Sequence, residues 1–197
     1  MNIRENKGNK RSWISAAAGS ILDWAETLVF AVFLVIISFT FIFKIANVVG
    51  HSMENTLTEG DRLIVSHLFY TPDCGDIAVI DSKALDDVII KRIIAVSNQK
   101  VVIDYNAGTV SVDGSILDEP YIKESEMRST GHFADAYYNE ENDTYEYDVP
   151  FGYVFVLGDN RNASSDSRVF GCVPQEDIIG RVVLRIYSRS GKIGRVE

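Results

Sequence analysis

The first feature along the chain is a long apolar run. Between Trp24 and Phe43 the only charged residue is Glu26, and beyond Leu28 only two hydroxyl side chains interrupt the run. A helix of about 20 residues, rising about 1.5 Å per residue, covers the roughly 30 Å hydrocarbon core of a bilayer and satisfies its own backbone there. A cleavable secretory signal would have a shorter apolar core that ends at small residues. We therefore predict that residues 24–43 form a single uncleaved transmembrane anchor.

After the anchor the pattern changes to short stretches rich in Ile and Val, separated by turn residues. None of these stretches has a helical period, so residues 44–197 are predicted to form one external domain that is mainly β. Residues 101–112 predict a hairpin, because β-branched residues alternate on both sides of an Asn-Ala-Gly turn. The predicted strands are residues 62–65, 76–80, 88–96, 100–104, 109–112, 153–157 and 181–187.

Residues 119–149 are less regular than the rest of the external domain. They are acidic and aromatic, above all in the segment YYNEENDTYEYD that begins at Tyr137. A run of charges usually marks a solvated surface. We interpret residues 119–149 as a surface excursion or a small cap on the domain rather than as a binding site.

Charge sets the expected orientation of the anchor. Basic flanks of a transmembrane segment tend to stay in the cytoplasm, and the segment before this anchor is rich in basic residues. We therefore expect residues 1–23 to be cytoplasmic and residues 44–197 to lie on the outer face of the membrane. The formal charge of the whole chain is −9, and all of this acidic excess falls in the external domain, which argues against a nucleic-acid partner. The basic residues before the anchor are Arg4, Lys7, Lys10 and Arg11.

Two cysteines, Cys74 and Cys172, lie in the external domain. A disulfide is chemically permitted outside the cytoplasm, and the sequence leaves both a disulfide and two free thiols open. Neither cysteine belongs to a CxxC motif or to a cluster with histidine, so no metal site is expected.

A first candidate for chemistry is Ser52, which lies in a short segment directly after the anchor. A serine here would act at the membrane surface. Neighbouring side chains of an extended or turning chain point apart, so His51 cannot readily take the proton from Ser52. His67 and His132, the other two histidines, lie in no motif that indicates a base, and a conventional triad therefore has no support.

A second candidate is the pair Lys91 and Arg92, which interrupts a very apolar predicted strand. Side chains alternate along a strand, so the two cations face opposite sides and at least one meets an apolar environment. Burial disfavours the ammonium and lowers the pKa of a lysine, and a neutral lysine can accept the proton of a serine hydroxyl. Taken alone, a lysine on an apolar strand is better explained by a side chain that reaches solvent or pairs with an acid.

A third candidate is the polar loop of residues 158–168, which follows an apolar predicted strand. Its composition suits ordinary turn chemistry. It also contains two acids and two cations, which suit a fixed network of ion pairs and hydroxyls that holds a neighbouring base in place.

Taken in order, the anchor and four motifs resemble the bacterial type I signal peptidases, and the resemblance covers almost the whole chain. The motifs are GHSMENTL from Gly50, GDRLIV from Gly60, KRIIAV from Lys91 and GDNRNASSDSR from Gly158. The resemblance implies a β-rich catalytic domain of the signal peptidase type after one N-terminal transmembrane helix. It also implies a serine endopeptidase, signal peptidase I, that uses a Ser/Lys dyad and needs no cofactor or metal.

The resemblance assigns roles to the residues that match the motifs. Ser52 matches the nucleophile and Lys91 the general base. Ser164 matches a serine that hydrogen-bonds and orients the lysine, and Ser165 beside it is the alternative. The backbone N–H of Ser52 would stabilise the oxyanion, while Gly50, where some members have a hydroxyl, supplies no side-chain donor. The residues that match the supporting ion-pair network are Asp166 and Arg168.

The same resemblance implies a substrate and a location. The substrates would be exported preproteins with small residues at the first and third positions before the cleavage site, and the lipid bilayer of a bacterial cell would hold both partners. Two other hypotheses are a self-cleaving repressor-like protein with the same pair and a catalytically silent, membrane-tethered β domain that binds partners through its acidic surface. The anchor and the lack of a DNA-binding segment argue against the first. Cleavage of an added signal-bearing substrate would exclude the second.

Overall fold

The computed structural model describes residues 23–37, 40, 42–122 and 137–196. Contacts between residues divide the chain into two compact units, Met1–Ile42 and Phe43–Glu197. The boundary lies one residue before the end of the predicted anchor.

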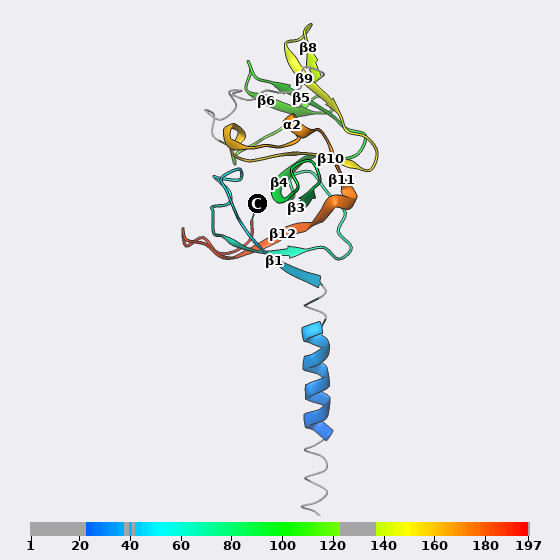
Figure 1. Ribbon diagram of the computed structural model, residues 1–197, viewed down its shortest axis with the longest axis vertical. Helices are drawn as coiled ribbons and strands as arrows, with labels where there is room; N and C mark the ends of the chain where they lie inside the picture. The colour runs from blue at the N-terminus through cyan, green and yellow to red at the C-terminus, as the bar shows by residue number, and fades with distance from the viewer. Residues whose placement is uncertain (1–22, 38–39, 41, 123–136, 197) are drawn as a thin grey trace, which may run out of the picture. The chain divides into compact units, whose positions relative to one another are not determined.

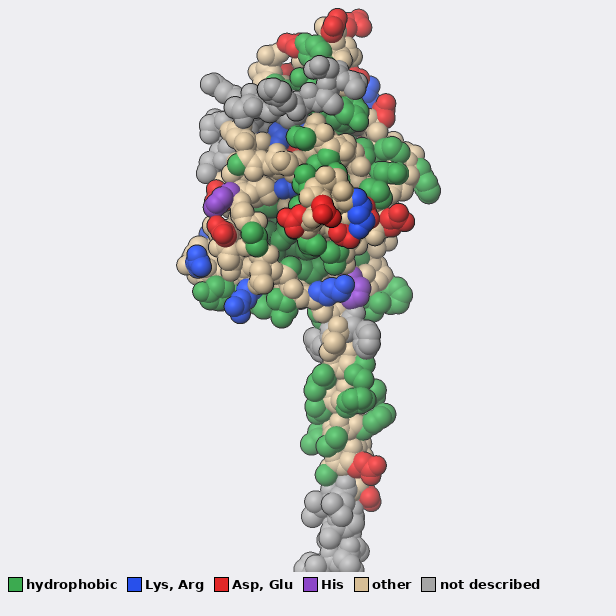
Figure 2. Space-filling model, in the orientation of Figure 1, with side chains coloured by type: hydrophobic (Ala, Val, Ile, Leu, Met, Phe, Trp, Pro, Cys, Tyr) green, Lys and Arg blue, Asp and Glu red, His purple; other side chains and the backbone are tan. Residues whose placement is uncertain are grey.

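Residues 23–37 of the first unit are helical. Their apolar side chains are largely exposed, and Figure 2 shows them covering the helix beyond acidic side chains near one end. Within the described part of the chain, no helix is both long enough and apolar enough to cross a membrane. Residues 38, 39 and 41 of the predicted anchor and residues 1–22 of the predicted cytoplasmic segment lie outside the described residues.

The second unit is mainly β, as predicted, and its described strands form two antiparallel sheets (Figure 1). The larger sheet has the order β1-β2-β12-β3-β4-β10-β11 and the smaller sheet the order β7-β6-β5-β9-β8. Figure 1 shows the strands β5, β6, β8 and β9 together at one end of the unit and β1 and β12 at the other.

The strands of the larger sheet are β1 (Phe43–Asn47), β2 (Arg62–Ser66), β3 (Ile77–Ser82), β4 (Asp87–Ala95), β10 (Tyr153–Leu157), β11 (Val173–Pro174) and β12 (Ile178–Tyr187). Those of the smaller sheet are β5 (Lys100–Asp104), β6 (Thr109–Val112), β7 (Ser115–Ile116), β8 (Tyr138–Asn139) and β9 (Thr144–Asp148). Short helices at η3 (Arg161–Ala163), α2 (Ser167–Phe170) and η4 (Gln175–Asp177) connect β10, β11 and β12. All seven predicted strands are present, with small shifts at their ends.

The burial of the strands follows from the positions that their apolar residues occupy. Strands β2 and β5 alternate between buried and more exposed residues, so one face of each packs on the core. Strands β3 and β10 are buried over most of their length, as their continuous apolar sequence requires. Strand β4 becomes buried only from Lys91 onward. The half of β4 that carries Lys91 and Arg92 therefore lies inside the domain.

The predicted hairpin is present, because β5 and β6 pair antiparallel from Val101 opposite Val112 onward. The described part of residues 119–149 contributes to the same sheet. Strand β9 pairs with β5, and Tyr147 on β9 is buried in the core with its ring 4.7 Å from that of Phe155. This segment thus combines exposed acidic positions with a buried strand, and its residues 123–136 lie outside the described residues.

Candidate active site

Ser52 lies in a turn between β1 and β2. The backbone N–H of Leu57 donates to the carbonyl of Met53 at 2.8 Å, which closes one helix-like turn. The side chains of Met53 and Leu57 are both buried in one apolar cluster. Residues four apart in a helical turn face the same side, so this pair anchors the turn to the core. Ser52, which is half-buried, is thereby held at the edge of that cluster.

Lys91 lies on β4, opposite Ala78 of β3. Its Nζ atom is 2.7 Å from Oγ of Ser52, within hydrogen-bond distance. Only 3% of the surface of Lys91 is exposed. The structure therefore brings together the two residues that the sequence suggested as nucleophile and base, although 39 positions separate them.

Burial lowers the pKa of Lys91 from 10.5 to about 8. Loss of hydration is the largest cause, because it disfavours the charged ammonium. The negative charges of Asp166 and Asp159 act against this effect, while the positive charge of Arg168 adds to it. With a pKa near 8, about a tenth of Lys91 is neutral at pH 7 and able to accept a proton.

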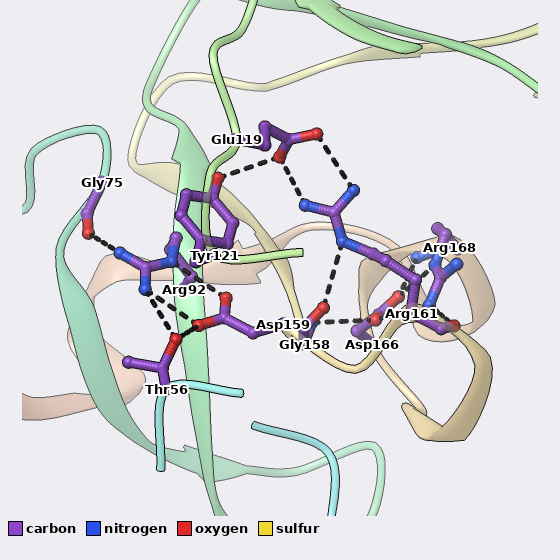
Figure 3. Close-up of polar contacts among 10 residues, drawn as sticks. All are labelled: Thr56, Gly75, Arg92, Glu119, Tyr121, Gly158, Asp159, Arg161, Asp166 and Arg168. Carbon is purple, nitrogen blue, oxygen red and sulfur yellow. Dashed lines mark hydrogen bonds and ion pairs between the residues drawn. The ribbon is translucent and has the colours of Figure 1, made fainter. Parts of the chain in front are cut away.

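Arg92 is as buried as Lys91 and makes a separate set of contacts (Figure 3). Its Nε and Nη2 donate to the two carboxylate oxygens of Asp159 at 2.9 and 2.8 Å, and its Nη1 donates to the carbonyl of Gly75 at 2.9 Å. Its guanidinium stacks over the ring of Tyr121, 3.9 Å from the centroid. Thr56, in the turn of Ser52, donates its hydroxyl to Asp159 at 2.5 Å. Arg92 and Asp159 thus connect β4, the loop after β10 and the Ser52 turn.

A second buried ion pair joins Arg161 to Glu119. Nη1 of Arg161 lies 3.2 Å from Oε2 of Glu119, and the hydroxyl of Tyr121 donates to the other carboxylate oxygen at 2.9 Å. The Nε of Arg161 donates to the carbonyl of Gly158 at 3.1 Å. Glu119 and Tyr121 therefore link the first ion pair to the second, as Figure 3 shows.

The predicted partners Asp166 and Arg168 form a third buried ion pair. Nε and Nη2 of Arg168 donate to the two oxygens of Asp166 at 2.8 and 2.9 Å. Asp166 also accepts from the backbone N–H of Arg168 as the N-cap of α2, and from the backbone N–H of Gly158 at 3.0 Å. The Nη2 of Arg168 reaches the carbonyl of Arg161 at 2.7 Å. These bonds fix the conformation of residues 158–168.

The loop of residues 158–168 packs directly on the Ser52 turn. The backbone N–H of Asn160 donates to the carbonyl of Ser52 at 3.0 Å. A Cβ atom at Gly158 would lie 2.5 Å from that carbonyl oxygen and 2.3 Å from Oγ of Ser164, which real side chains essentially never tolerate. Only glycine therefore fits at position 158 with this approach of the two segments.

The hydrogen bond from Ser164 to Lys91, expected from the resemblance, is not present in this structure. The Oγ of Ser164 is buried and makes no hydrogen bond to any described residue. Its neighbour Ser165 is exposed. Ser164 is nevertheless close to the site, because it packs against the same glycine as the Ser52 carbonyl.

The remaining candidates lie apart from this chemistry. His51 is exposed and its Nδ1 lies 2.5 Å from a carboxylate oxygen of Glu54, so it is not paired with Ser52. Cys74 and Cys172 are both free thiols, which resolves the alternative that the sequence left open. Within the described residues, no group of three or more His, Cys, Asp or Glu side chains could hold a metal ion.

Four residues around the site received no individual role from the sequence. Asp159 and Arg161 belong to the polar loop, and Glu119 and Tyr121 belong to the segment interpreted as a surface excursion or cap. The sequence could have pointed to these residues only through the general rule that a buried charge requires a partner. The partners themselves are far apart in the sequence, 67 positions for Arg92 and Asp159 and 42 for Arg161 and Glu119. A local sequence pattern cannot identify such pairs.

Comparison with known proteins identifies the family of the chain. Residues 21–187 match the protein family described as signal peptidase, peptidase S26. A probable signal peptidase I-1 of Synechocystis sp. is 38% identical over 156 residues, which cover 73% of this chain and 71% of that protein. Signal peptidase IB of Staphylococcus aureus is 30% identical over 174 residues, which cover 85% of this chain and 90% of that protein.

A crystal structure of a signal peptidase I from Enterococcus faecalis is also similar, with 29% sequence identity and a TM-score of 0.43, and covers 57% of this chain and 97% of that one. The family match spans most of the chain, including Ser52, Lys91 and the polar loop. The chain therefore belongs to the signal peptidase family, peptidase S26.

Proposed function

We propose that this chain is a membrane-anchored signal peptidase I in which Ser52 is the nucleophile and Lys91 the general base. Its reaction is the removal of N-terminal signal peptides from exported preproteins. One observation carries the assignment of the dyad: Nζ of a buried lysine lies 2.7 Å from the hydroxyl of Ser52. A serine hydroxyl is a weak nucleophile until a neighbouring base takes its proton.

The proposed reaction follows from the protonation state of Lys91. The neutral amine accepts the Ser52 proton while Oγ attacks the carbonyl carbon of the scissile bond. The resulting ammonium then protonates the leaving amine, which releases the mature protein and leaves the signal peptide esterified to Ser52. Lys91, neutral again, takes a proton from water, whose oxygen attacks the ester, and the ammonium returns the proton to Oγ. No cofactor takes part in these reaction steps.

The supporting roles rest on the polar loop. Asp166 and Arg168 would hold residues 158–168 against the Ser52 turn through the bonds that they make to Gly158 and Arg161. Ser164 would orient the ammonium of Lys91, because its buried hydroxyl lies against Gly158 beside the Ser52 carbonyl and makes no hydrogen bond to a described residue. The backbone N–H of Ser52 would stabilise the oxyanion without help from a side chain at position 50.

The substrate and the membrane complete the proposal. Small residues at the first and third positions before the cut would occupy shallow pockets beside Ser52. The apolar run of residues 28–43 supports an anchor in the bacterial cell membrane, with residues 1–23 in the cytoplasm and the catalytic domain on the outer face. A signal peptide in the same bilayer would then meet the enzyme at the depth of the active site.

Purified Ser52→Ala and Lys91→Ala variants test the dyad. Each variant is expected to lose preprotein cleavage by at least about 10³-fold, because the nucleophile or its base is missing. The measurement is the rate at which a purified preprotein is converted to its mature form in detergent. Matched controls are Ser165→Ala and Lys100→Ala, which remove exposed side chains of the same types and should keep near-normal rates.

Circular dichroism of each variant must show a folded protein, so that a loss of cleavage reports on chemistry. Near-normal cleavage by the folded Ser52→Ala protein would exclude Ser52 as the nucleophile. Near-normal cleavage by Lys91→Ala would exclude Lys91 as the base.

A further inference from the structure

A cationic cavity lies beside the Ser52 turn. It has a volume of about 360 Å³ and is lined on one side by Asn55, Thr56 and Tyr121. The other side is formed by cations that come from the end of β12 and the segment after it. These cations are Arg185, Lys192 and Arg195. None of the described residues that line the cavity is acidic, although the chain as a whole has a charge of −9.

The position of the cations is fixed by backbone and side-chain hydrogen bonds. Gly194 and Arg185 exchange two backbone hydrogen bonds of 2.8 and 2.9 Å, so the segment with Lys192 and Arg195 folds back beside β12. The Nη1 of Arg185 donates to the carbonyl of Thr56 at 2.9 Å. The cationic wall is therefore tied directly to the turn that carries Ser52.

Two of the three cations have no described counter-charge. Arg185 is buried and pairs with Asp61 at 3.1 Å, so its charge is largely offset. Lys192 and Arg195 form no ion pair with any residue that the structure describes. An anion that entered the cavity would thus meet about two uncompensated positive charges and displace no acid.

The cavity is within reach of a substrate bound at Ser52. Thr56 follows Ser52 by about one helical turn, and the carbonyl of Met53 accepts from Thr56 N–H and from Leu57 N–H in that turn. One turn of helix rises about 5.4 Å, and an extended chain advances about 3.3 Å per residue. A peptide that extends along this turn from Ser52 Oγ would therefore reach the cavity within about three residues.

We propose that this cavity binds the carboxylate of an acidic substrate residue located within about three positions of the scissile bond. The inference rests on the proposed function, since it takes Ser52 as the point of cleavage. A carboxylate is the anion that a polypeptide substrate carries, and both ammonium and guanidinium groups bind it. The cavity would then favour acidic over neutral residues at one position of the preprotein.

Paired peptides test the proposal on the full-length enzyme. The two members of a pair differ only by Glu or Gln, and the pairs place this residue at each position within three residues of the cut that does not require a small side chain. We expect one position at which Glu is preferred by about three- to tenfold in kcat/KM, mainly through a lower KM, because partly exposed charge pairs contribute modestly. The preference should shrink as salt is raised to about 0.5 M.

The double variant Lys192→Gln/Arg195→Gln should bring the Glu-to-Gln ratio of kcat/KM close to one. The control Arg189→Gln, which removes an exposed cation outside the cavity, should keep the ratio of the unaltered enzyme. A ratio near one at every position in the unaltered enzyme, or a preference that survives the double variant, would overturn the proposal.

Two further results distinguish this inference from a failure of the proposed function and from the binding of lipid phosphate in the cavity. Cleavage of every peptide by Ser52→Ala would contradict the proposed function, whatever the Glu-to-Gln ratio is. The second result comes from activity measured in vesicles of phosphatidylcholine with and without phosphatidylglycerol. If phosphatidylglycerol changes the activity of the unaltered enzyme but not of the double variant, while the Glu-to-Gln ratio stays at one, the cavity binds lipid phosphate and the substrate proposal is wrong.

Discussion

At the scale of single residues, the protonation of Lys91 depends on burial and on three nearby charges. Burial is the largest effect and lowers the pKa, while Asp166 and Asp159 raise it and Arg168 lowers it. Each acid is paired with its own arginine, Asp166 with Arg168 and Asp159 with Arg92. The ion pairs therefore limit the field with which the two acids would otherwise keep the lysine protonated.

The pH dependence of cleavage follows from this balance. Because the folded-state pKa of Lys91 is lowered to about 8 and the base must be neutral, kcat/KM should rise with pH and level off above about pH 8. Below that value it should fall by about tenfold per pH unit, since one proton inactivates the base. Initial rates on a peptide without titratable side chains measure the profile. A profile that levels off near pH 6.5 would instead indicate a histidine as the base.

At the scale of elements, β4 carries the proposed general base on one side and an anchoring arginine on the other. Lys91 faces Ser52, while Arg92 holds Asp159, Gly75 and the ring of Tyr121. The strand and the loop after β10 are thereby fixed relative to each other. Arg92 thus supports the geometry of the proposed site through Asp159, Gly75 and Tyr121.

Replacement of Arg92 by Met tests this role. The variant leaves the carboxylate of Asp159 buried without its ion pair, which is expected to cost about 3–5 kcal/mol in the free energy of unfolding. Since the charge of Asp159 raises the pKa of Lys91, the acidic limb of kcat/KM should also move to higher pH. Urea unfolding and the pH profile measure the two effects.

The double variant Arg92→Met/Asp159→Asn is the control, because it removes the unpaired charge as well. It should return the acidic limb toward that of the unaltered enzyme and recover part of the stability. An unchanged acidic limb in the folded Arg92→Met protein would show that the pair does not affect Lys91.

The elements that could be predicted were those with a local signal. The Ile- and Val-rich strands and the hairpin between β5 and β6 were found, because alternation along a strand is visible in the sequence. Strand β9 was not, since its acidic and aromatic sequence TYEYD is typical of a surface and its burial comes from pairing with β5. Strands of two residues, such as β7, β8 and β11, are too short for any period.

In the candidate site, too, some features could be predicted from local sequence and others could not. Ser52 and Lys91 could be proposed because motifs carry them, and burial gave a physical reason for a neutral lysine. The pairing of Arg92 with Asp159 and of Arg161 with Glu119 could not be derived, because it joins segments that only the fold brings together. The bond expected from Ser164 to Lys91 is absent, and the Ser164 hydroxyl makes no hydrogen bond to a described residue.

At the scale of the whole molecule, every residue of the proposed site belongs to the unit Phe43–Glu197. The three apolar clusters and both sheets lie in that unit as well. The residues of the dyad and of the three buried ion pairs are all members of that unit. Catalysis and anchoring are therefore expected to be separable.

A protein that begins at Phe43 tests this separation. It retains β1 and all the core residues, so it should fold and cleave a short soluble peptide with kcat/KM within about threefold of that of the full chain in detergent. On a preprotein embedded in vesicles it should be slower by about 10²-fold or more, because it loses the high effective concentration that a shared bilayer provides. Cleavage in detergent and in vesicles, measured with both proteins, gives the two ratios. Equal loss on both substrates would mean that residues 1–42 support the fold of the site, and no loss on either would mean that the anchor does not act by concentrating the enzyme at its substrate.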